Sequence, residues 1–136
     1  MLGEIIVSLL AAGPAAGALA GRVYPGELPP EPALPAVAYQ RIAQRERLGA
    51  GGVAGLEACQ VQLSIVAEDY DTACSVAAAI RRGLSGWRGG LAGSGGTGYE
   101  VRRVVFESEH DVAEGMPAVV AQTWAFHWRE RPPLAG

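Results

Sequence analysis

The clearest pattern of hydrophobic and polar positions runs from Glu57 to Ala67. Apolar side chains at every second position alternate with polar ones, in the order Cys59, Gln60, Val61, Gln62, Leu63, Ser64, Ile65. Successive side chains of a β-strand point to opposite faces of a sheet. The pattern therefore predicts a strand with one face in a core and one polar face, which is typical of an antiparallel or mixed sheet.

Three further segments alternate in the same way and predict strands over 36–44, 99–109 and 118–129. In the last of these, one face carries Val120, Trp124, Phe126 and Trp128. The doublets at 102–103 and 104–105 break the alternation and predict a β-bulge. Residues 110–117 would join the last two strands as a hairpin, and Val23 and Tyr24 form a brief extended segment.

Helical spacing appears in two places. Residues 4–12 carry an apolar stripe, and a second short helical piece runs to about Leu19. The longer helix begins near Asp69, because Asp and Thr side chains at 69–72 can cap the first backbone N–H groups. Its apolar stripe follows at i, i+3, i+4, i+7 and i+11, in Ala73, Val76, Ala77, Ile80 and Leu84.

The segments between these elements are rich in proline and glycine. Prolines at positions 25, 29, 30, 32 and 35 make 25–34 a stiff extended connector. We expect 45–55 to be a flexible excursion, 87–98 to be a glycine-rich loop and 130–136 to be a flexible end. The pattern as a whole predicts one domain over 1–136 with an α+β fold. Its mostly antiparallel or mixed sheet has about four strands, and helices pack on one face.

Composition narrows the function classes. The 136 residues carry a net charge of -3 at pH 7, and the pI is near 5.3, which argues against a nucleic-acid binder with a basic surface. All 11 basic residues are arginine, so chemistry that needs a lysine, such as a Schiff base or a P-loop, is excluded. Cys59 and Cys74 are too few for a disulfide framework.

The apolar N-terminal run from Ile5 to Ala20 ends in a sequence that resembles a signal-peptide cleavage site. The charge that precedes it is Glu4, whereas a signal peptide carries positive charge there. Pro14 and two glycines interrupt the run, which is also too short to span a bilayer. These features favour a helix of the folded domain and predict no membrane partner.

Candidate chemistry is sparse. Residues 93–98 match the pattern G-x-G-x-x-G, but they follow a predicted helix and precede a strand, the reverse of a dinucleotide site. Glu107, Glu109 and Asp111 alternate on one predicted strand face, where they would form a solvated end or meet an arginine of a neighbouring subunit. Neither they nor the two histidines have the spacing of a metal site. We therefore expect no catalytic residue, no metal and no cofactor.

Tryptophan and arginine dominate the energetics of protein interfaces. Trp124 is predicted to be core. Trp87, beside Arg88 at a helix end, is predicted to contact a partner. The excursion that begins with Arg45, Arg47 and Leu48 is a second candidate interface, and Glu107 and Glu109 form a third.

The segment 21–42 reads Gly-Arg-Val-Tyr-Pro-Gly-Glu-Leu-Pro-Pro-Glu-Pro-Ala-Leu-Pro-Ala-Val-Ala-Tyr-Gln-Arg-Ile. An apolar helix precedes it, and an alternating strand and an Asp-initiated helix follow. In this order of segments the chain resembles the tail-completion proteins of long-tailed bacteriophages, also called tail terminators or head–tail joining proteins, over roughly 5–129. The proline density of 25–35 and the length of the loop 90–98 depart from that family.

The resemblance implies a structural virion protein without enzymatic activity. Such proteins form a ring, usually a hexamer, at the head-proximal end of the tail tube, and present a surface to the head connector. The implied partners are other copies of the chain, the tail tube protein and a head-completion or connector protein. DNA would pass through the lumen without sequence-specific binding, and assembly would occur in the host cytoplasm.

Two other classes remain compatible with the sequence. One is a different neck or head-closure component, or the same part in a phage-derived particle such as a gene transfer agent. The other is a small secreted binding domain, which would require the N-terminal run to be a signal peptide.

Overall fold

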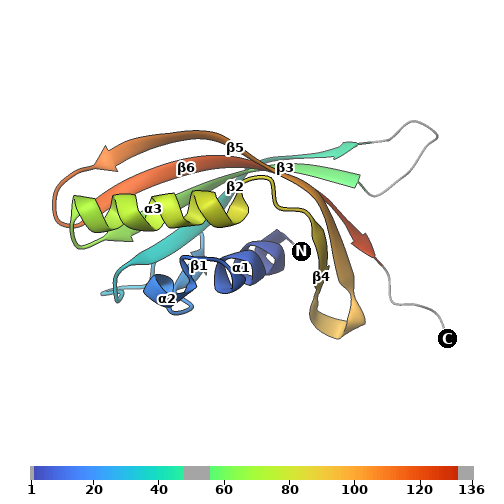
Figure 1. Ribbon diagram of the computed structural model, residues 1–136, viewed down its shortest axis with the longest axis horizontal. Helices are drawn as coiled ribbons and strands as arrows, with labels where there is room; N and C mark the ends of the chain where they lie inside the picture. The colour runs from blue at the N-terminus through green and yellow to red at the C-terminus, as the bar shows by residue number, and fades with distance from the viewer. Residues whose placement is uncertain (1, 48–55, 132–136) are drawn as a thin grey trace.

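The computed structural model describes residues 2–47 and 56–131 (Figure 1). Three α-helices and six β-strands follow one another along the chain. In order they are α1 (Leu2–Ala12), α2 (Ala16–Leu19), β1 (Val23–Pro25), β2 (Ala36–Arg47), β3 (Leu56–Ala67), α3 (Tyr70–Leu84), β4 (Gly89–Ala92), β5 (Gly98–Ala113) and β6 (Ala118–Arg131). A short 3-10 helix, η1 (Ser94–Gly96), lies between β4 and β5.

The strands form one six-stranded mixed sheet in the order β1-β2-β3-β6-β5-β4. β1 is parallel to β2, and every other pair is antiparallel. The α+β class and the predominance of antiparallel pairing were predicted correctly, but the expected count of about four strands was wrong. β1 and β4 have three and four residues and border the sheet, so they are too short to produce a recognisable alternation.

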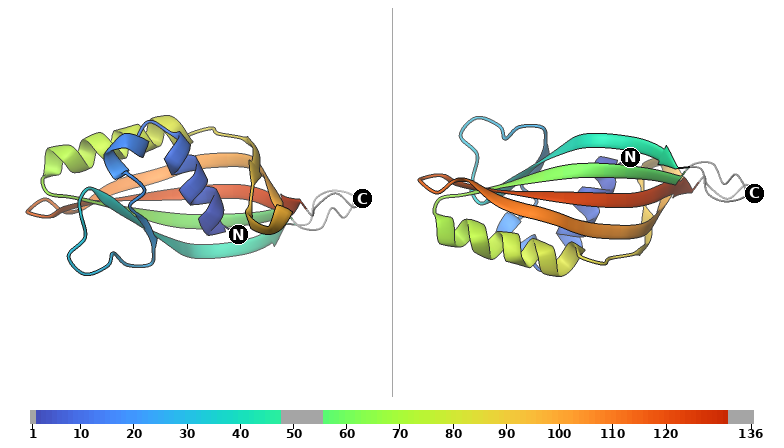
Figure 2. Two further views of the ribbon diagram at one scale, coloured as in Figure 1. Left: turned by 90° about the horizontal axis from the view of Figure 1, so that it is seen from below. Right: turned by 90° about the horizontal axis from the view of Figure 1, so that it is seen from above.

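The helices cover one face of the sheet and leave the other bare, as the two views of Figure 2 show. The covered face carries the odd-numbered positions of β3 from Cys59 to Ile65, each at most 1% exposed. The matching face of β6 carries Val120, Trp124, Phe126 and Trp128. The predicted assignment of core positions on these two strands is confirmed.

The helix α3 starts where the sequence predicts. The carboxylate of Asp69 accepts a hydrogen bond from the backbone N–H of Thr72 at 2.7 Å. The predicted stripe from Ala73 to Leu84 is buried against the sheet. α1 packs against α3 at Gly83, where a Cβ atom would lie 2.7 Å from Cδ of Pro14. No helix in the described part of the chain is long and apolar enough to cross a membrane.

The hairpin of β5 and β6 is longer than predicted. β5 continues through Ala113, so the connection shrinks to residues 114–117. The predicted bulge near Arg102 is present, and the register with β6 shifts again between Phe106 and Ser108 and between Asp111 and Ala113. Bulges add residues to one strand of a pair, so the faces of β5 cannot be read from simple alternation.

Several segments expected to be loops contain regular structure. Residues 45–47 continue β2, so Arg45 and Arg47 lie in a strand, whereas Leu48 and the rest of the excursion to 55 lie outside the described residues. The glycine-rich segment 87–98 contains β4 and η1. Residues 130 and 131 of the expected flexible end belong to β6, and 132–136 lie outside the described residues.

Candidate assembly surfaces

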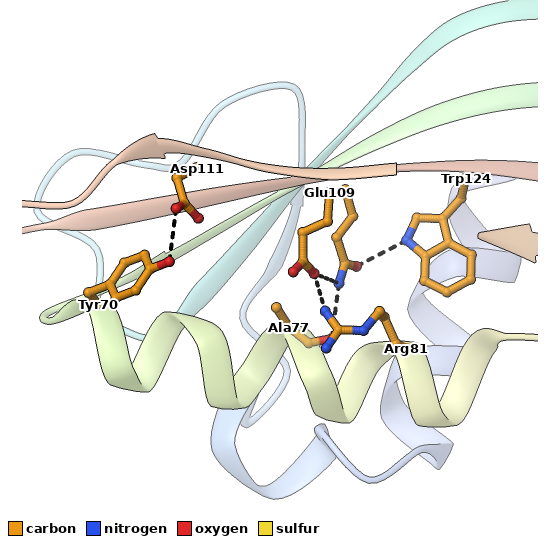
Figure 3. Close-up of polar contacts among 7 residues, drawn as sticks. Tyr70, Ala77, Arg81, Glu109, Asp111 and Trp124 are labelled. Carbon is orange, nitrogen blue, oxygen red and sulfur yellow. Dashed lines mark hydrogen bonds and ion pairs between the residues drawn. The ribbon is translucent and has the colours of Figure 1, made fainter. Parts of the chain in front are cut away.

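Two of the three hairpin carboxylates bind side chains of α3, as Figure 3 shows. Glu109 forms an ion pair with Arg81, and Asp111 accepts a hydrogen bond from the Tyr70 hydroxyl at 2.8 Å. Glu109 therefore pairs with an arginine of its own subunit, and the expected contact with an arginine of a neighbouring subunit stays a prediction. These contacts attach the outer hairpin to the helix layer.

A buried glutamine stands behind this ion pair. The side-chain amide of Gln122 donates to the carbonyl of Ala77 and to Glu109, both at 2.9 Å, and its Oε1 accepts from the indole N–H of Trp124 at 3.0 Å. Gln122 is 0% exposed on the helix-covered face of β6. Buried polar groups require such partners, so this network fixes the position of the hairpin relative to α3.

Glu107 lies on the opposite face from Glu109. The register shift between Phe106 and Ser108 makes Glu107 the extra residue of a bulge. Its carboxylate accepts from the side chain of Gln60 at 3.1 Å, on the bare face of the sheet. The expectation that the three carboxylates share one face is wrong, because a bulge reverses the alternation at that point.

The described residues do not form a metal site, and the thiol of Cys59 is buried. The described residues contain no group of three or more His, Cys, Asp and Glu side chains that could hold a metal ion. Burial raises the pKa of the Cys59 thiol, which keeps it protonated and unreactive at neutral pH. Cys59 thus packs as a small apolar side chain.

The G-x-G-x-x-G segment forms a corner that is fixed to α1. Ser94 donates its hydroxyl to Glu4 at 2.6 Å, and the Tyr99 hydroxyl donates to the same carboxylate at 2.7 Å. These bonds hold the pKa of Glu4 below its usual value and raise the pKa of Tyr99 to about 12. The glycine-rich pattern gives no sign that Ser94 is held in place, because its partner Glu4 lies ninety positions earlier in the sequence.

The predicted interface pair Trp87 and Arg88 follows α3. Trp87 is half-buried and packs against the hydrophobic core, and a Cβ atom on Gly89 would lie 3.2 Å from its ring. Arg88 is exposed. Part of the tryptophan is therefore engaged within the subunit, and the exposed part lies beside an exposed cation.

A cluster of arginines on the bare face was not predicted. Glu100 lies within 2.7 Å of Arg129, 3.2 Å of Arg131 and 3.3 Å of Arg102. The hydrogen bond from Arg129 is the main cause of the lowered pKa of Glu100. The sequence shows these arginines on two separate strands, and the pairing of β5 with β6 brings them together around one carboxylate.

A groove opens on the helix-covered face near the start of α1. Its volume is about 670 Å³. Its lining includes Leu2, Pro25, Tyr39, Glu57, Trp128 and Glu130. Aromatic side chains and carboxylates thus meet at a concave surface that the sequence pattern did not identify, because its walls come from five separate elements.

Comparisons with known proteins agree with this architecture. One chain of a solved structure, described as "Virion of native gene transfer agent (GTA) particle", has a TM-score of 0.65 and 19% sequence identity, with 94% of each chain covered. At that identity the likeness shows a shared fold. Comparison with curated protein sequences gives no match.

The family model "Tail completion protein gp17" matches residues 4–122. The matched region starts in α1 and ends within β6, so it covers all the helices and strands except the ends of α1 and β6. The resemblance noted from the order of segments is confirmed over most of its extent. The chain therefore belongs to the family of tail completion proteins, which are structural proteins of phage-type particles.

Proposed function

We propose that this protein is a ring-forming tail terminator at the head–tail junction, which caps the tail tube and joins it to the head connector. The observation that carries the proposal is the family match over 4–122, which runs from α1 into the first part of β6. We expect six copies in the ring. The partners would be the tail tube protein on one side and a head-completion or connector protein on the other.

The distribution of polar groups supports a role in assembly. The hairpin carboxylates, the buried glutamine and the Ser94 corner all serve contacts within the subunit. What remains exposed is a bare sheet face, the arginines around Glu100, and the pair Trp87 and Arg88. A closed ring requires two different complementary surfaces on each subunit, and the molecule offers different surfaces on different sides.

The bare sheet face fits a lumen that DNA crosses without sequence-specific binding. Over β3 it presents the neutral side chains of Gln60, Gln62 and Ser64, which neither retain phosphates nor repel them strongly. The arginines on this face surround the carboxylate of Glu100, which offsets part of their charge. The protein would reside in the virion and assemble in the host cytoplasm.

A second candidate is another neck or head-closure component, including the equivalent part of a gene transfer agent. The shared fold with a chain of a gene transfer agent virion supports this second candidate. Neighbouring genes for a major tail protein and a tape-measure protein would favour the tail terminator.

Deletion of the gene from its particle tests the proposed function. We expect filled heads separate from unjoined or overlong tails in electron micrographs, and restoration of joined particles by the wild-type gene in trans. Normal infectious tailed particles after deletion would contradict the proposal. Heads that lose their DNA beside tails of normal length would favour the head-closure candidate instead.

A further inference from the structure

The outer edge of β2 is unpaired over its second half. β1 pairs with Val37–Tyr39, and the last bond on this side runs from the N–H of Gly26 to the carbonyl of Tyr39 at 2.9 Å. Beyond it, no strand in the described part of the chain flanks residues 40–47. The right view of Figure 2 shows β2 as one border of the sheet. An unpaired edge presents backbone groups that can bind another strand.

The opposite border of the sheet has a matching unpaired edge. β4 pairs with β5 at residues 98–101, and the N–H of Gly86 donates to the carbonyl of Val104 at 3.0 Å. From Val105 to Ala113, β5 has no outer partner strand among the described residues, and 107–113 are exposed. Each subunit therefore has two free edges, one on each border.

The directions of the two edges suit a continuous sheet. Since β2, β3, β6 and β5 alternate in direction, β5 runs opposite to β2. A second copy in the same orientation would place its β5 antiparallel to β2 of the first. Strand addition of this type is an established mode of protein recognition.

The charges of the two edges are opposite. Residues 40–47 of β2 include three arginines and one glutamate, whereas residues 105–113 of β5 include three carboxylates and no arginine. Of these carboxylates Glu109 is already paired with Arg81 of its own subunit, whereas Glu107 and Asp111 contact only neutral side chains among the described residues. Opposite charges across paired strands stabilise the pair, and like charges destabilise it. Pairing of β2 with β5 is thus favoured, while pairing of either edge with itself is opposed.

Both edges also expose an apolar side chain. Ile42 is 50% exposed and Val112 is 58% exposed. Each lies where the register shifts, between Arg41 and Ala43 in β2 and between Asp111 and Ala113 in β5. Charges and bulges can guard an edge against pairing in a monomer. Here, however, the two edges carry opposite charges and each exposes an apolar side chain. These features fit pairing between the two different edges better than protection against pairing.

The two free stretches define an offset between copies. Within one subunit His110 pairs with Ala121, which pairs with Ser64, which in turn pairs with Ala38. His110 and Ala38 therefore lie in the same row of residues across the sheet. β1 occupies the edge beside Ala38, so β5 of a neighbour must slide toward the free half of β2. Placing residues 106–113 opposite 40–47 brings His110 beside Ala43. Offsets of this kind accompany tilted strands in a closed barrel.

We propose that residues 40–47 of β2 pair antiparallel with residues 106–113 of β5 in a second copy of this chain, so that one sheet continues from subunit to subunit. This inference rests on the proposed ring, and it names the surfaces that join its subunits. The interface is heterologous, as a closed ring requires.

Disulfide cross-linking of assembled tails tests the pairing. Ala43 and His110 are exposed, and their paired residues Gln60 and Ala121 place both on the bare sheet face. In tails assembled under reducing conditions and then oxidised, Ala43→Cys with His110→Cys should give a ladder of cross-linked chains. Ala43→Cys combined with Ala12→Cys, an exposed position at the end of α1 in the helix layer, should give none.

A charge exchange provides a second measurement that does not depend on the cysteine variants assembling. In this register Arg45 lies opposite Ser108, and the bulge residue Glu107 beside Ser108 is the nearest carboxylate to it. Arg45→Glu or Glu107→Arg alone should therefore cause loss of ring assembly, and the two together should restore it. Glu107 is suitable because its contact within the subunit is one exposed hydrogen bond from Gln60. Circular dichroism would check that each variant folds.

Intact tails with no ladder would overturn the inference, as would a cross-link to a different tail protein or equal assembly of all charge variants. Gene deletion reports the role at the head–tail junction whatever the edges do. A ladder with normal particles after deletion would therefore reject the proposed function and keep the edge pairing. Unjoined tails after deletion without a ladder would do the reverse.

Discussion

The buried Gln122 provides the sharpest test of how the hairpin is held. Gln122→Leu keeps most of the side-chain volume but removes the acceptor of the Trp124 indole N–H and the donor to Ala77 and Glu109. Glu109 retains its ion pair with Arg81. The principal cost is therefore the indole N–H, which stays buried in a side chain that is 0% exposed.

An unsatisfied buried donor costs about 1–3 kcal/mol. At about 0.05–0.15 kcal/mol per residue, a chain of this length has a free energy of unfolding of about 7–20 kcal/mol. Gln122→Leu should therefore fold, with a clearly lowered stability. Trp124→Phe removes the indole N–H and leaves a cavity, and it also leaves the Gln122 oxygen without its partner.

A double-mutant cycle by urea denaturation measures the coupling. The double variant has neither the orphaned donor nor the orphaned acceptor, so it should be more stable than the sum of the single effects predicts by about 1–3 kcal/mol. Gln62→Leu on the bare sheet face is the matched control and should change stability by less than about 0.5 kcal/mol. Additive single effects, or an equal loss for Gln62→Leu, would refute the role assigned to the buried network.

The remaining predictions concern the core, the helix contact and the pH dependence. Val61→Asp should prevent folding because Val61 is 0% exposed and a buried unpaired charge costs several kcal/mol or more, whereas Gln62→Asp should be mild; equal thermal midpoints would reject the strand assignment. Gly83→Ala should lower stability by about 1–3 kcal/mol, because its Cβ would overlap the proline ring after α1, and Gly17→Ala, with nothing within 4 Å, should not; denaturant midpoints would compare them. The pKa of Glu4 is lower in the folded protein than its usual 4.5, so its carboxylate adds stability above that value, and this stability is lost as the pH falls through the folded pKa. The thermal midpoint of Glu4→Gln should thus fall less steeply than that of wild type between about pH 5 and pH 3, and parallel curves would contradict the assigned contacts.

Features that depend on near neighbours in the chain could be predicted from the sequence. Alternation at every second position identified β3 and β6 and their core faces, because a strand reverses its side chains at each residue. The spacing of three and four residues identified α3, and Asp69 marked its start because a cap acts within one turn. The order of these segments was also sufficient to recognise the family, which the match over residues 4–122 confirms.

The tertiary structure decided what depends on residues far apart in sequence. A bulge placed Glu107 and Glu109 on opposite faces, and no local pattern reports a register shift that the partner strand imposes. Gln122 occupies a core position because α3 and Trp124 satisfy its amide there. β1 and β4 are strands because longer neighbours pair with them. Because both are short, the outer edges of the C-terminal halves of β2 and β5 stay unpaired among the described residues. The sequence thus specified the elements through local periodicity, whereas hydrogen bonds and packing between distant segments determined which faces and edges remain for assembly.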